Sequence, residues 1–270
     1  MDSDATSGNR TPSTVAEYFG RLAATYGDGV YYGNRRRAVL DAIAAEIARA
    51  RDVLDVGCGN GAYLAKFAAA PGNRRVIGAD LSIDMLMSAR ERVGLKCRLL
   101  CADASQPPFK PDSFDFIFAS HVFQFVADLD RVVAELARCI RPGAVLIATG
   151  PREGSVRQML SAIVGSDRWP EYRQLIFQRA PRPQADAGPD DRCQRAFAGA
   201  GLRVEERAAP FTVNWADIEE FVRIRWMPVI PGAEREQATA MLAEVAQAAR
   251  AAASRSFKLT ELLILGWRDA

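Results

Sequence analysis

The sequence predicts an α/β fold built on a central, mostly parallel sheet that helices cover on both faces. Three observations support this class: short apolar runs alternate with helical runs between residues 53 and 149, a glycine-rich loop follows the first apolar run, and a β-rich run closes the chain. Strands separated by helices of this length pair in parallel through right-handed crossovers. A nucleotide-like cofactor is expected at the end of the first strand.

The elements are expected in a fixed order. An N-terminal helix at 13–25 and a second helix at 35–50 flank a loop at 26–33 that is rich in glycine and tyrosine. Five strands are expected next, at 53–56, 75–79, 97–101, 114–119 and 144–149. Three helices separate them, at 62–70, 83–93 and 129–140. Ser82 is the expected N-cap of the middle helix, and Pro142 with Gly143 is expected to end the last one.

After residue 150 the alternation loosens. Two short helices are expected within 155–180, followed by a loop at 181–191 and a helix at 192–200. A strand at 203–213, helices at 216–225 and 234–253, and a final strand at 257–267 complete the prediction.

The composition excludes several classes of protein. A net charge of +2 is too small to indicate nucleic-acid binding, and five cysteines without a C-x-x-C pair fit single thiols in a reducing cytosol. The polar start of the chain shows no secretory signal, and no apolar run approaches the 18 residues of a membrane span. His121 is the only histidine, so no metal site built on histidines is expected. We expect a cytoplasmic monomer or homodimer that needs no membrane.

The glycine-rich loop is the most informative stretch. Gly57, Gly59 and Gly61 allow left-handed backbone angles and a close approach of a ligand to the main chain. Gly57-x-Gly59-x-x-Ala62 satisfies a dinucleotide-binding pattern. Asp55, two positions before the first glycine, would repel a pyrophosphate and would suit a ligand that carries an ammonium and a sulfonium group. Alternatively, Asp55 caps the loop by accepting backbone N–H bonds, and both roles can coexist.

Two further aspartates follow predicted strands. Asp80 ends the second strand, 21 residues after Gly59, where a carboxylate can accept both hydroxyls of a ribose. The alternative is that Asp80 caps the next helix, although Ser82 is better placed for that. Asp103 follows the third strand and could accept the exocyclic amine of an adenine. Its alternative is an exposed loop aspartate.

Taken together, these motifs resemble class I S-adenosylmethionine-dependent methyltransferases. The similarity is greatest to the small-molecule branch that includes ubiquinone/menaquinone-type and trans-aconitate-type enzymes. It covers residues 50–150 and, more loosely, the final strand. It is carried by Leu-Asp-Val-Gly-Cys-Gly-Asn-Gly at 54–61, Gly-Ala-Asp-Leu-Ser at 78–82, Ala-Asp-Ala at 102–104, Pro-Phe at 108–109, Phe-Asp-Phe-Ile at 114–117 and Leu-Ala-Arg-Cys-Ile-Arg-Pro-Gly at 136–143.

The resemblance implies a Rossmann-like sheet of seven strands with an antiparallel last strand, and S-adenosylmethionine as the cofactor. The domains would be a disordered tail at 1–12, a helical cover at 13–50, a cofactor-binding core at 51–150, a helical lid with the remaining sheet elements at 151–256 and the final strand at 257–270.

The resemblance also assigns roles in cofactor binding. The loop from Gly57 to Gly61 would hold the methionine end and Asp80 the ribose, while Leu81 would flank the adenine. Asp103 and Ala104 would meet the edge of the adenine. Ser120 and His121 would lie near the sulfonium. Tyr26 would belong to the N-terminal A-x-x-Y-D element that covers the cofactor, although Gly27 displaces the aspartate by one position.

Methyl transfer is an in-line displacement at a sulfonium carbon, so the protein mainly positions the acceptor and excludes water. A base is needed only if the acceptor must lose a proton. His121 is the only imidazole, and we expect it to act as that base or to orient the acceptor. Alternatively, it hydrogen-bonds the cofactor or packs under the lid. Oxygen is the expected acceptor atom.

The acceptor pocket is expected to be aromatic, with a cover from 155–180 and 215–230. Ordinary packing of the lid is the alternative for the large side chains of the cover. Arginines in the cover raise the hypothesis of an anionic acceptor. The pocket residues are Tyr18, Tyr31, Tyr32, Phe123, Gln124 and Phe125, the cover residues are Trp169, Tyr172, Trp226 and Met227, and the arginines are Arg157, Arg168, Arg173, Arg223 and Arg225.

Other functions are weighed against this one. The chain lacks the Asn-Pro-Pro-Tyr motif of base amino methylation and the Pro-Cys nucleophile of cytosine methylation. A nicotinamide-dependent oxidoreductase would need a loop that tolerates pyrophosphate, which Asp55 opposes. A protein that binds S-adenosylmethionine without transferring its methyl group stays open. The large cover favours a dedicated metabolite of secondary metabolism.

Overall fold

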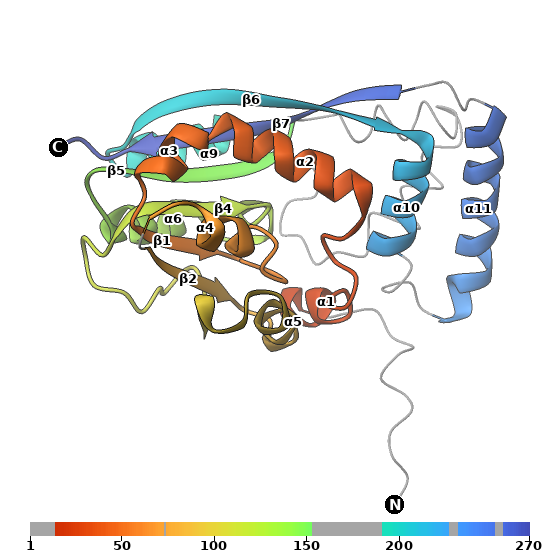
Figure 1. Cartoon of the computed structure of the whole chain (residues 1–270), viewed down its shortest axis with the longest axis horizontal. Helices are drawn as coiled ribbons and strands as arrows, with labels where there is room; N and C mark the ends of the chain where they lie inside the picture. Colours follow the sequence, from red (N-terminus) through yellow and green to blue (C-terminus); the bar gives the residue numbers. More distant parts are fainter. Residues whose placement is uncertain (1–13, 73, 153–190, 227–231, 252–255) are drawn as a thin grey trace, which may run out of the picture.

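A computed structural model describes residues 14–72, 74–152, 191–226, 232–251 and 256–270. Its centre is a seven-stranded sheet with the order β3-β2-β1-β4-β5-β7-β6 (Figure 1). The first five strands pair in parallel, and β7 is antiparallel to both β5 and β6. The predicted α/β class and antiparallel last strand are therefore confirmed. The strands are β1 Asp52–Val56, β2 Arg75–Asp80, β3 Arg98–Cys101, β4 Phe114–Ser120, β5 Ile140–Pro151, β6 Arg203–Asn214 and β7 Ser256–Trp267.

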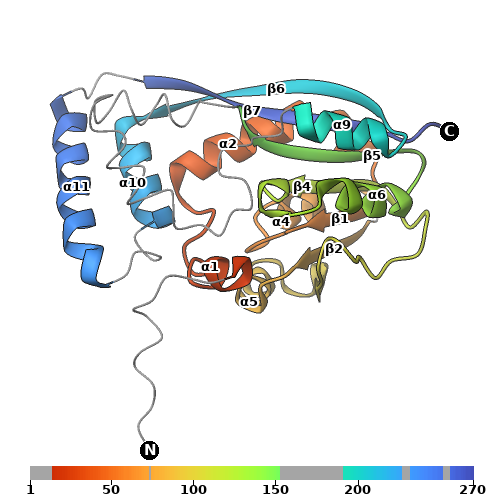
Figure 2. The same cartoon turned by 180° about the vertical axis from the view of Figure 1, so that it is seen from behind.

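Helices cover both faces of this sheet. The helices α6 and α9 lie on one face, while α2, α3 and α4 lie on the other, as the front and back views show (Figures 1 and 2). The long helices α10 and α11 stand beyond one end of the sheet. The helices are α1 Val15–Gly20, α2 Gly29–Ala42, α3 Ala44–Arg49, α4 Leu64–Ala69, α5 Ile83–Val93, α6 Leu129–Cys139, α9 Asp191–Gly199, α10 Trp215–Trp226 and α11 Gly232–Ala251, with short 3-10 turns at Gly94–Lys96 and Phe123–Phe125.

The central strands are apolar on both sides because both faces are covered. In β4, Ile117 packs with the α6 side, whereas Phe116 and Phe118 pack with α4 on the other. All three side chains are at most 1% exposed. This double burial explains why β4 is continuously apolar over residues 116–119 rather than alternating.

The helix α5 has the predicted bounds, and its predicted N-cap is confirmed. The Ser82 hydroxyl accepts a hydrogen bond from the Met85 amide at 3.3 Å. This bond satisfies one of the amides that every helix leaves free at its start. Local chemistry alone therefore sets where this helix begins.

The prediction of a loop at 26–33 is wrong. The helix α2 begins at Gly29, with Asp28 at its N-cap position, and it ends at Ala42, so the helix predicted at 35–50 is two helices. Tyr31 and Tyr32 in its first turn are 3% and 2% exposed. Burial of these two rings outweighs the low helix propensity of the nearby glycines. The first helix is likewise shorter than predicted, because α1 ends at Gly20.

The last helix of the core ends one residue before its predicted end, just ahead of Pro142 and Gly143. The helix α6 ends at Cys139 and β5 begins at the next residue. Pro142 and Gly143 lie inside β5, where the pairing with β4 shifts register. There Gly143 adopts a φ of 76° and donates its N–H to the Arg268 carbonyl at 2.8 Å.

The helices predicted within 155–180 and the loop at 181–190 lie outside the described residues. None of the helices in the described ranges has the length and apolar character that crossing a bilayer would require.

Candidate functional site

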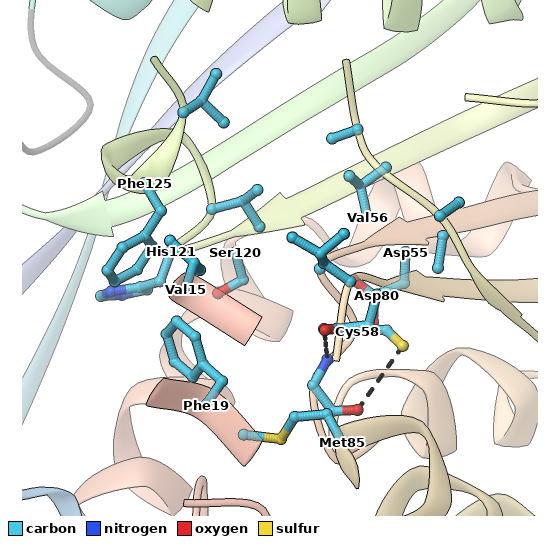
Figure 3. Close-up of a pocket in the computed structure, with 18 of the residues that line it drawn as sticks. Val15, Phe19, Asp55, Val56, Cys58, Asp80, Met85, Ser120, His121 and Phe125 are labelled. Atoms are coloured by element: carbon cyan, nitrogen blue, oxygen red, sulfur yellow. Dashed lines mark hydrogen bonds between the residues drawn. The ribbon is translucent and has the colours of Figure 1, made fainter. Parts of the chain in front are cut away.

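A cavity of about 400 Å³ opens at the carboxyl ends of β1, β2 and β4 (Figure 3). In this sheet the strand order reverses at β1, with β2 on one side and β4 on the other. Open α/β sheets bind their ligands in the crevice at such a reversal. In Figure 3, Asp55, Cys58 and Asp80 lie on one side of the cavity, and Phe19, His121 and Phe125 lie on the other, with Ser120 between them. The cavity therefore has an acidic side and an aromatic side.

The glycine-rich loop forms the floor of the acidic side. Gly57 and Gly59 adopt φ angles of 63° and 53°, which confirms the predicted left-handed backbone. The Gly59 amide donates to Asp80 Oδ2 at 2.8 Å, a bond drawn in Figure 3. The Asn60 side chain donates to the Tyr26 carbonyl and so ties the N-terminal segment to the loop.

Adding a side chain at Gly57 is expected to cost more than backbone strain alone. A Cβ there would lie 2.4 Å from Val122 Cγ2, at a φ that already disfavours alanine. Gly57→Ala should lose about 1–2 kcal/mol of unfolding free energy to the left-handed backbone, and a further loss should come from the contact. Chemical denaturation measures both. Gly201→Ala is the matched control, because Gly201 has a φ of 77° and a Cβ added there would meet no atom within 4 Å. Equal losses in the two variants would contradict the contact with Val122.

Asp55 is the most unusual group on the acidic side. It lines the cavity, it is 2% exposed, and its Oδ2 has no hydrogen-bond partner in the part of the chain that the structure describes. Burial raises the pKa of the Asp55 carboxyl well above its ordinary value, and the nearby Asp80 raises it further. Capping of the loop does not account for Oδ2. A bound cation would compensate this atom.

Asp80 serves the protein's own backbone as well as the cavity. Its Oδ2 accepts from Gly59 and its Oδ1 accepts from the Ser82 amide at 2.9 Å. Burial raises the pKa of the Asp80 carboxyl, and these backbone hydrogen bonds act against that rise. The carboxylate therefore braces the loop and the residues just before α5 while it lines the cavity, and its contact with a ribose stays a prediction.

The other predicted cofactor residues also line the cavity. Leu81 is 49% exposed, and Asp103 accepts a hydrogen bond from the Ser105 amide at 2.8 Å. Ser120 shares a hydrogen bond of 3.0 Å with the Thr149 hydroxyl. The predicted set that reaches the cavity comprises Tyr26, Asp55, Gly57, Gly59, Asp80, Leu81, Asp103, Ala104, Ser120 and His121.

His121 lies at the end of β4 in a left-handed conformation, with a φ of 58°. Its amide donates to the Thr149 carbonyl at 2.9 Å, and its Nε2 lies 2.6 Å from Glu261 Oε1 on β7. Arg35 Nε lies 3.4 Å from the same oxygen. Backbone strain of this kind concentrates at functional sites.

Sequence reasoning missed Glu261 and Arg35. Glu261 is 1% exposed and Arg35 is 9% exposed. Arg35 lines the cavity. The available signal was a single carboxylate inside the apolar run of the last strand, Leu-Thr-Glu-Leu-Leu-Ile-Leu. Tyr63, also missed, lines the cavity, and burial raises the pKa of its hydroxyl to about 12.

The aromatic side only partly matches the predicted acceptor pocket. Tyr32 and Phe125 line the cavity, but Tyr18, Tyr31, Phe123 and Gln124 are not among its lining residues. Tyr18 is 1% exposed and packs in a small core with Leu22, Ala23 and Met85. Phe123 packs against Phe197, with ring centroids 6.2 Å apart. Packing within the protein buries Tyr18, Tyr31 and Phe123, and acceptor contacts of these three residues and of Gln124 stay predictions.

The predicted cover residues are mostly outside the described part of the chain. This holds for Arg157, Arg168, Trp169, Tyr172, Arg173 and Met227, and for the side chains of Arg225 and Trp226 in α10. Arg223 is exposed on α10.

Comparison with known proteins agrees with this geometry. Residues 54–148 match the family model described as "Methyltransferase domain". The chain is 38% identical over 143 residues to the biotin biosynthesis bifunctional protein BioHC of Cellvibrio japonicus, covering 51% of this chain and 27% of BioHC. It is 33% identical over 124 residues to the malonyl-[acyl-carrier protein] O-methyltransferase of Hamiltonella defensa, covering 46% of this chain and 47% of that protein. The matched segment thus spans about half or less of these relatives.

The fold has solved counterparts over nearly its whole length. The YcgJ protein of Bacillus subtilis superimposes with a TM-score of 0.59 at 20% identity, covering 87% of this chain and 99% of that one. Identity at this level supports the shared fold alone.

Proposed function

We propose that the chain, whose residues 54–148 match a methyltransferase domain, transfers a methyl group from S-adenosylmethionine to an oxygen of a small molecule. The observation that carries this proposal is Asp55. This buried carboxylate lines the cavity directly before the glycine-rich loop, and one of its oxygens has no hydrogen-bond partner among the residues that the structure describes. It fits a ligand that brings an ammonium group and disfavours one that brings a pyrophosphate.

The residues of the acidic side fit the parts of this cofactor. Asp55 would take the ammonium group, and the loop from Gly57 to Gly61 would hold the methionine end. Asp80 would accept from the ribose hydroxyls. The adenine would lie against Leu81, Asp103 and Ala104, while Tyr26 would cover the site and Ser120 would lie near the sulfonium. When bound, the cofactor supplies a methyl group that is already activated for displacement.

The aromatic side suits the acceptor. Tyr32, Tyr63 and Phe125 line the same cavity as His121, so the protein can hold an apolar acceptor there and exclude water around it. The name of the Hamiltonella relative supports oxygen as the acceptor atom. Glu261 already pairs with the buried Arg35, so we propose a neutral acceptor in place of the anionic one considered from the sequence. His121 is proposed as its base.

Calorimetry with three ligands tests the cofactor. We expect S-adenosylmethionine and S-adenosylhomocysteine to bind with micromolar or better affinity, because both carry the ammonium group that Asp55 would accept, and NADH to bind at least about 100-fold more weakly. A preference for NADH would overturn the proposal in favour of the oxidoreductase alternative. Mass spectrometry detects methyl transfer to a set of phenols, enols and carboxylic acids. Binding of S-adenosylmethionine without transfer to any of them would favour the non-methylating alternative.

Two further properties belong to the same proposal. A cytoplasmic location and a monomeric or homodimeric state remain predictions. Size-exclusion chromatography with light scattering measures the oligomeric state directly.

A further inference from the structure

A buried ionic cluster stands behind the aromatic side of the cavity. It joins three elements distant in sequence: Arg35 from α2, His121 from the end of β4 and Glu261 from β7. Glu261 Oε1 lies 2.6 Å from His121 Nε2 and 3.4 Å from Arg35 Nε. Arg35 and His121 line the cavity, whereas Glu261 does not. Glu261 can therefore reach a ligand only through its neighbours.

The chemistry of these groups sets the direction of the hydrogen bond. An ionised carboxylate only accepts hydrogen bonds, so a bond of 2.6 Å from His121 Nε2 requires a proton on that nitrogen. The Arg35 guanidinium beside Glu261 supplies the opposite charge to this carboxylate. In a neutral imidazole the other nitrogen, Nδ1, then carries the lone pair. We propose that Glu261 is a positioning residue that fixes His121 as the Nε2-protonated tautomer, with Nδ1 as the base for an acceptor hydroxyl.

This inference rests on the proposed function and narrows its acceptor to a neutral hydroxyl. The acceptor O–H bond breaks and the proton passes to Nδ1. The electron pair left on the oxygen forms the new bond to the methyl carbon, while the methyl–sulfur bond breaks and its electron pair leaves on the sulfur of S-adenosylhomocysteine. Glu261 then stabilises the imidazolium that results, as a buried carboxylate does in other His–carboxylate pairs. A carboxylate acceptor would need no base and would meet a second negative charge nearby.

The other groups around the cluster do not replace His121. The phenols of Tyr26, Tyr31 and Tyr63 lie near Arg35. The ring of Tyr32 lies under the Arg35 guanidinium, 5.0 Å from ring centroid to guanidinium carbon. The hydroxyl of Ser120 directly precedes His121 in the chain. Burial raises the pKa of Tyr63 to about 12, so this phenol stays protonated at neutral pH. For Arg35, burial lowers the pKa but the charge of Glu261 and of nearby tyrosines outweighs it, so the guanidinium stays charged.

The single histidine of the chain makes the test direct. In the full chain produced without a histidine tag, every imidazole signal in a nitrogen–proton NMR correlation belongs to His121. At pH values above the titration midpoint of the ring, we expect the wild-type spectrum to show a protonated Nε2 and an unprotonated Nδ1. The opposite tautomer, or a mixture like that of free histidine, would overturn the inference without any variant.

Substitutions at Glu261 supply the second readout. In Glu261→Gln the titration midpoint of the ring signals should fall by about one pH unit or more, because the carboxylate that favours the imidazolium is gone. In Glu261→Asp the titration midpoint of the ring signals should fall by less. Glu205→Gln is the matched control, since Glu205 also pairs with an arginine on the sheet but lies on β6 against Arg207. An unchanged titration midpoint and an unchanged tautomer of His121 in Glu261→Gln would contradict the inference.

Separate experiments test the proposed function and the positioning role of Glu261, so either claim can be contradicted while the other holds. Binding of S-adenosylmethionine by calorimetry reports on the proposed function and does not depend on the His121 tautomer. The NMR readout needs no substrate, so it holds even if no acceptor has been found. With a hydroxyl acceptor, Glu261→Gln should lower kcat more than KM and move the acid limb of the rate profile, which loss of packing alone would not do.

Discussion

Asp55→Asn is expected to weaken binding of S-adenosylmethionine by about 100-fold and at the same time to make the free protein more stable. The Asp55 carboxyl is buried, lacks a partner at Oδ2 among the described residues and has a raised pKa. Loss of its charge removes a charge-assisted hydrogen bond to the cofactor ammonium, which corresponds to a loss of affinity of about 100-fold. The same change removes the cost of burying an ionisable carboxyl.

The sign of the stability change follows from proton linkage. A carboxyl whose pKa is higher in the folded state binds fewer protons when unfolded, so its contribution to stability falls as pH rises from the unfolded pKa towards the folded one. Asn cannot titrate, so Asp55→Asn should gain about 1–2 kcal/mol over wild type near neutral pH. The gain should shrink towards pH 4. Thermal unfolding between pH 4 and 8, with and without S-adenosylmethionine, measures both effects.

Asp52 provides the control with the opposite sign. It lies on the same strand, and although burial acts to raise its pKa, hydrogen bonds from Arg141 and Arg75 at 2.7 Å bring it below the ordinary value. Its stabilising contribution is present above the unfolded pKa and is lost as pH falls through the folded one. Asp52→Asn should therefore destabilise the protein near neutral pH and leave cofactor binding intact. Equal behaviour of the two variants would contradict the role given to Asp55.

The parts of the fold that the sequence predicts well are those fixed by neighbours along the chain. The helix α5 starts where Ser82 can cap it, and the loop after β1 turns where Gly57 and Gly59 allow a positive φ. Asp80 ends β2, and the carboxyl end of this strand lies at the cavity. The sequence predicts this aspartate from its distance of 21 residues from Gly59.

The parts that the sequence misses depend on contacts across the molecule. The start of α2 is set by burial of Tyr31 and Tyr32, and no local pattern reports that burial. Glu261 reaches His121 only because β7 inserts antiparallel between β5 and β6, 140 residues along the chain. A charge within an apolar strand signals that a buried partner exists, but the partner can be named only once the sheet order is known.

His121→Gln is expected to lower kcat for hydroxyl acceptors by about 10²–10⁴-fold, the usual contribution of a positioned base. Gln can keep a hydrogen bond to Glu261 but cannot take up a proton. The affinity for S-adenosylmethionine, measured by calorimetry, should change little, because Asp55 and Asp80 lie on the other side of the cavity (Figure 3). A large loss of affinity for S-adenosylmethionine in His121→Gln would instead indicate that His121 binds the cofactor.

Matched acceptors separate the base role from mere positioning. A phenol and the carboxylic acid of the same ring size present an oxygen at similar places, but only the phenol must lose a proton near neutral pH. His121→Gln should therefore depress transfer to the phenol far more than transfer to the acid, and raising the pH towards the ionisation of the phenol should recover part of the lost rate. Equal losses for both acceptors, with no recovery at high pH, would assign His121 to orientation and leave the proton to another group.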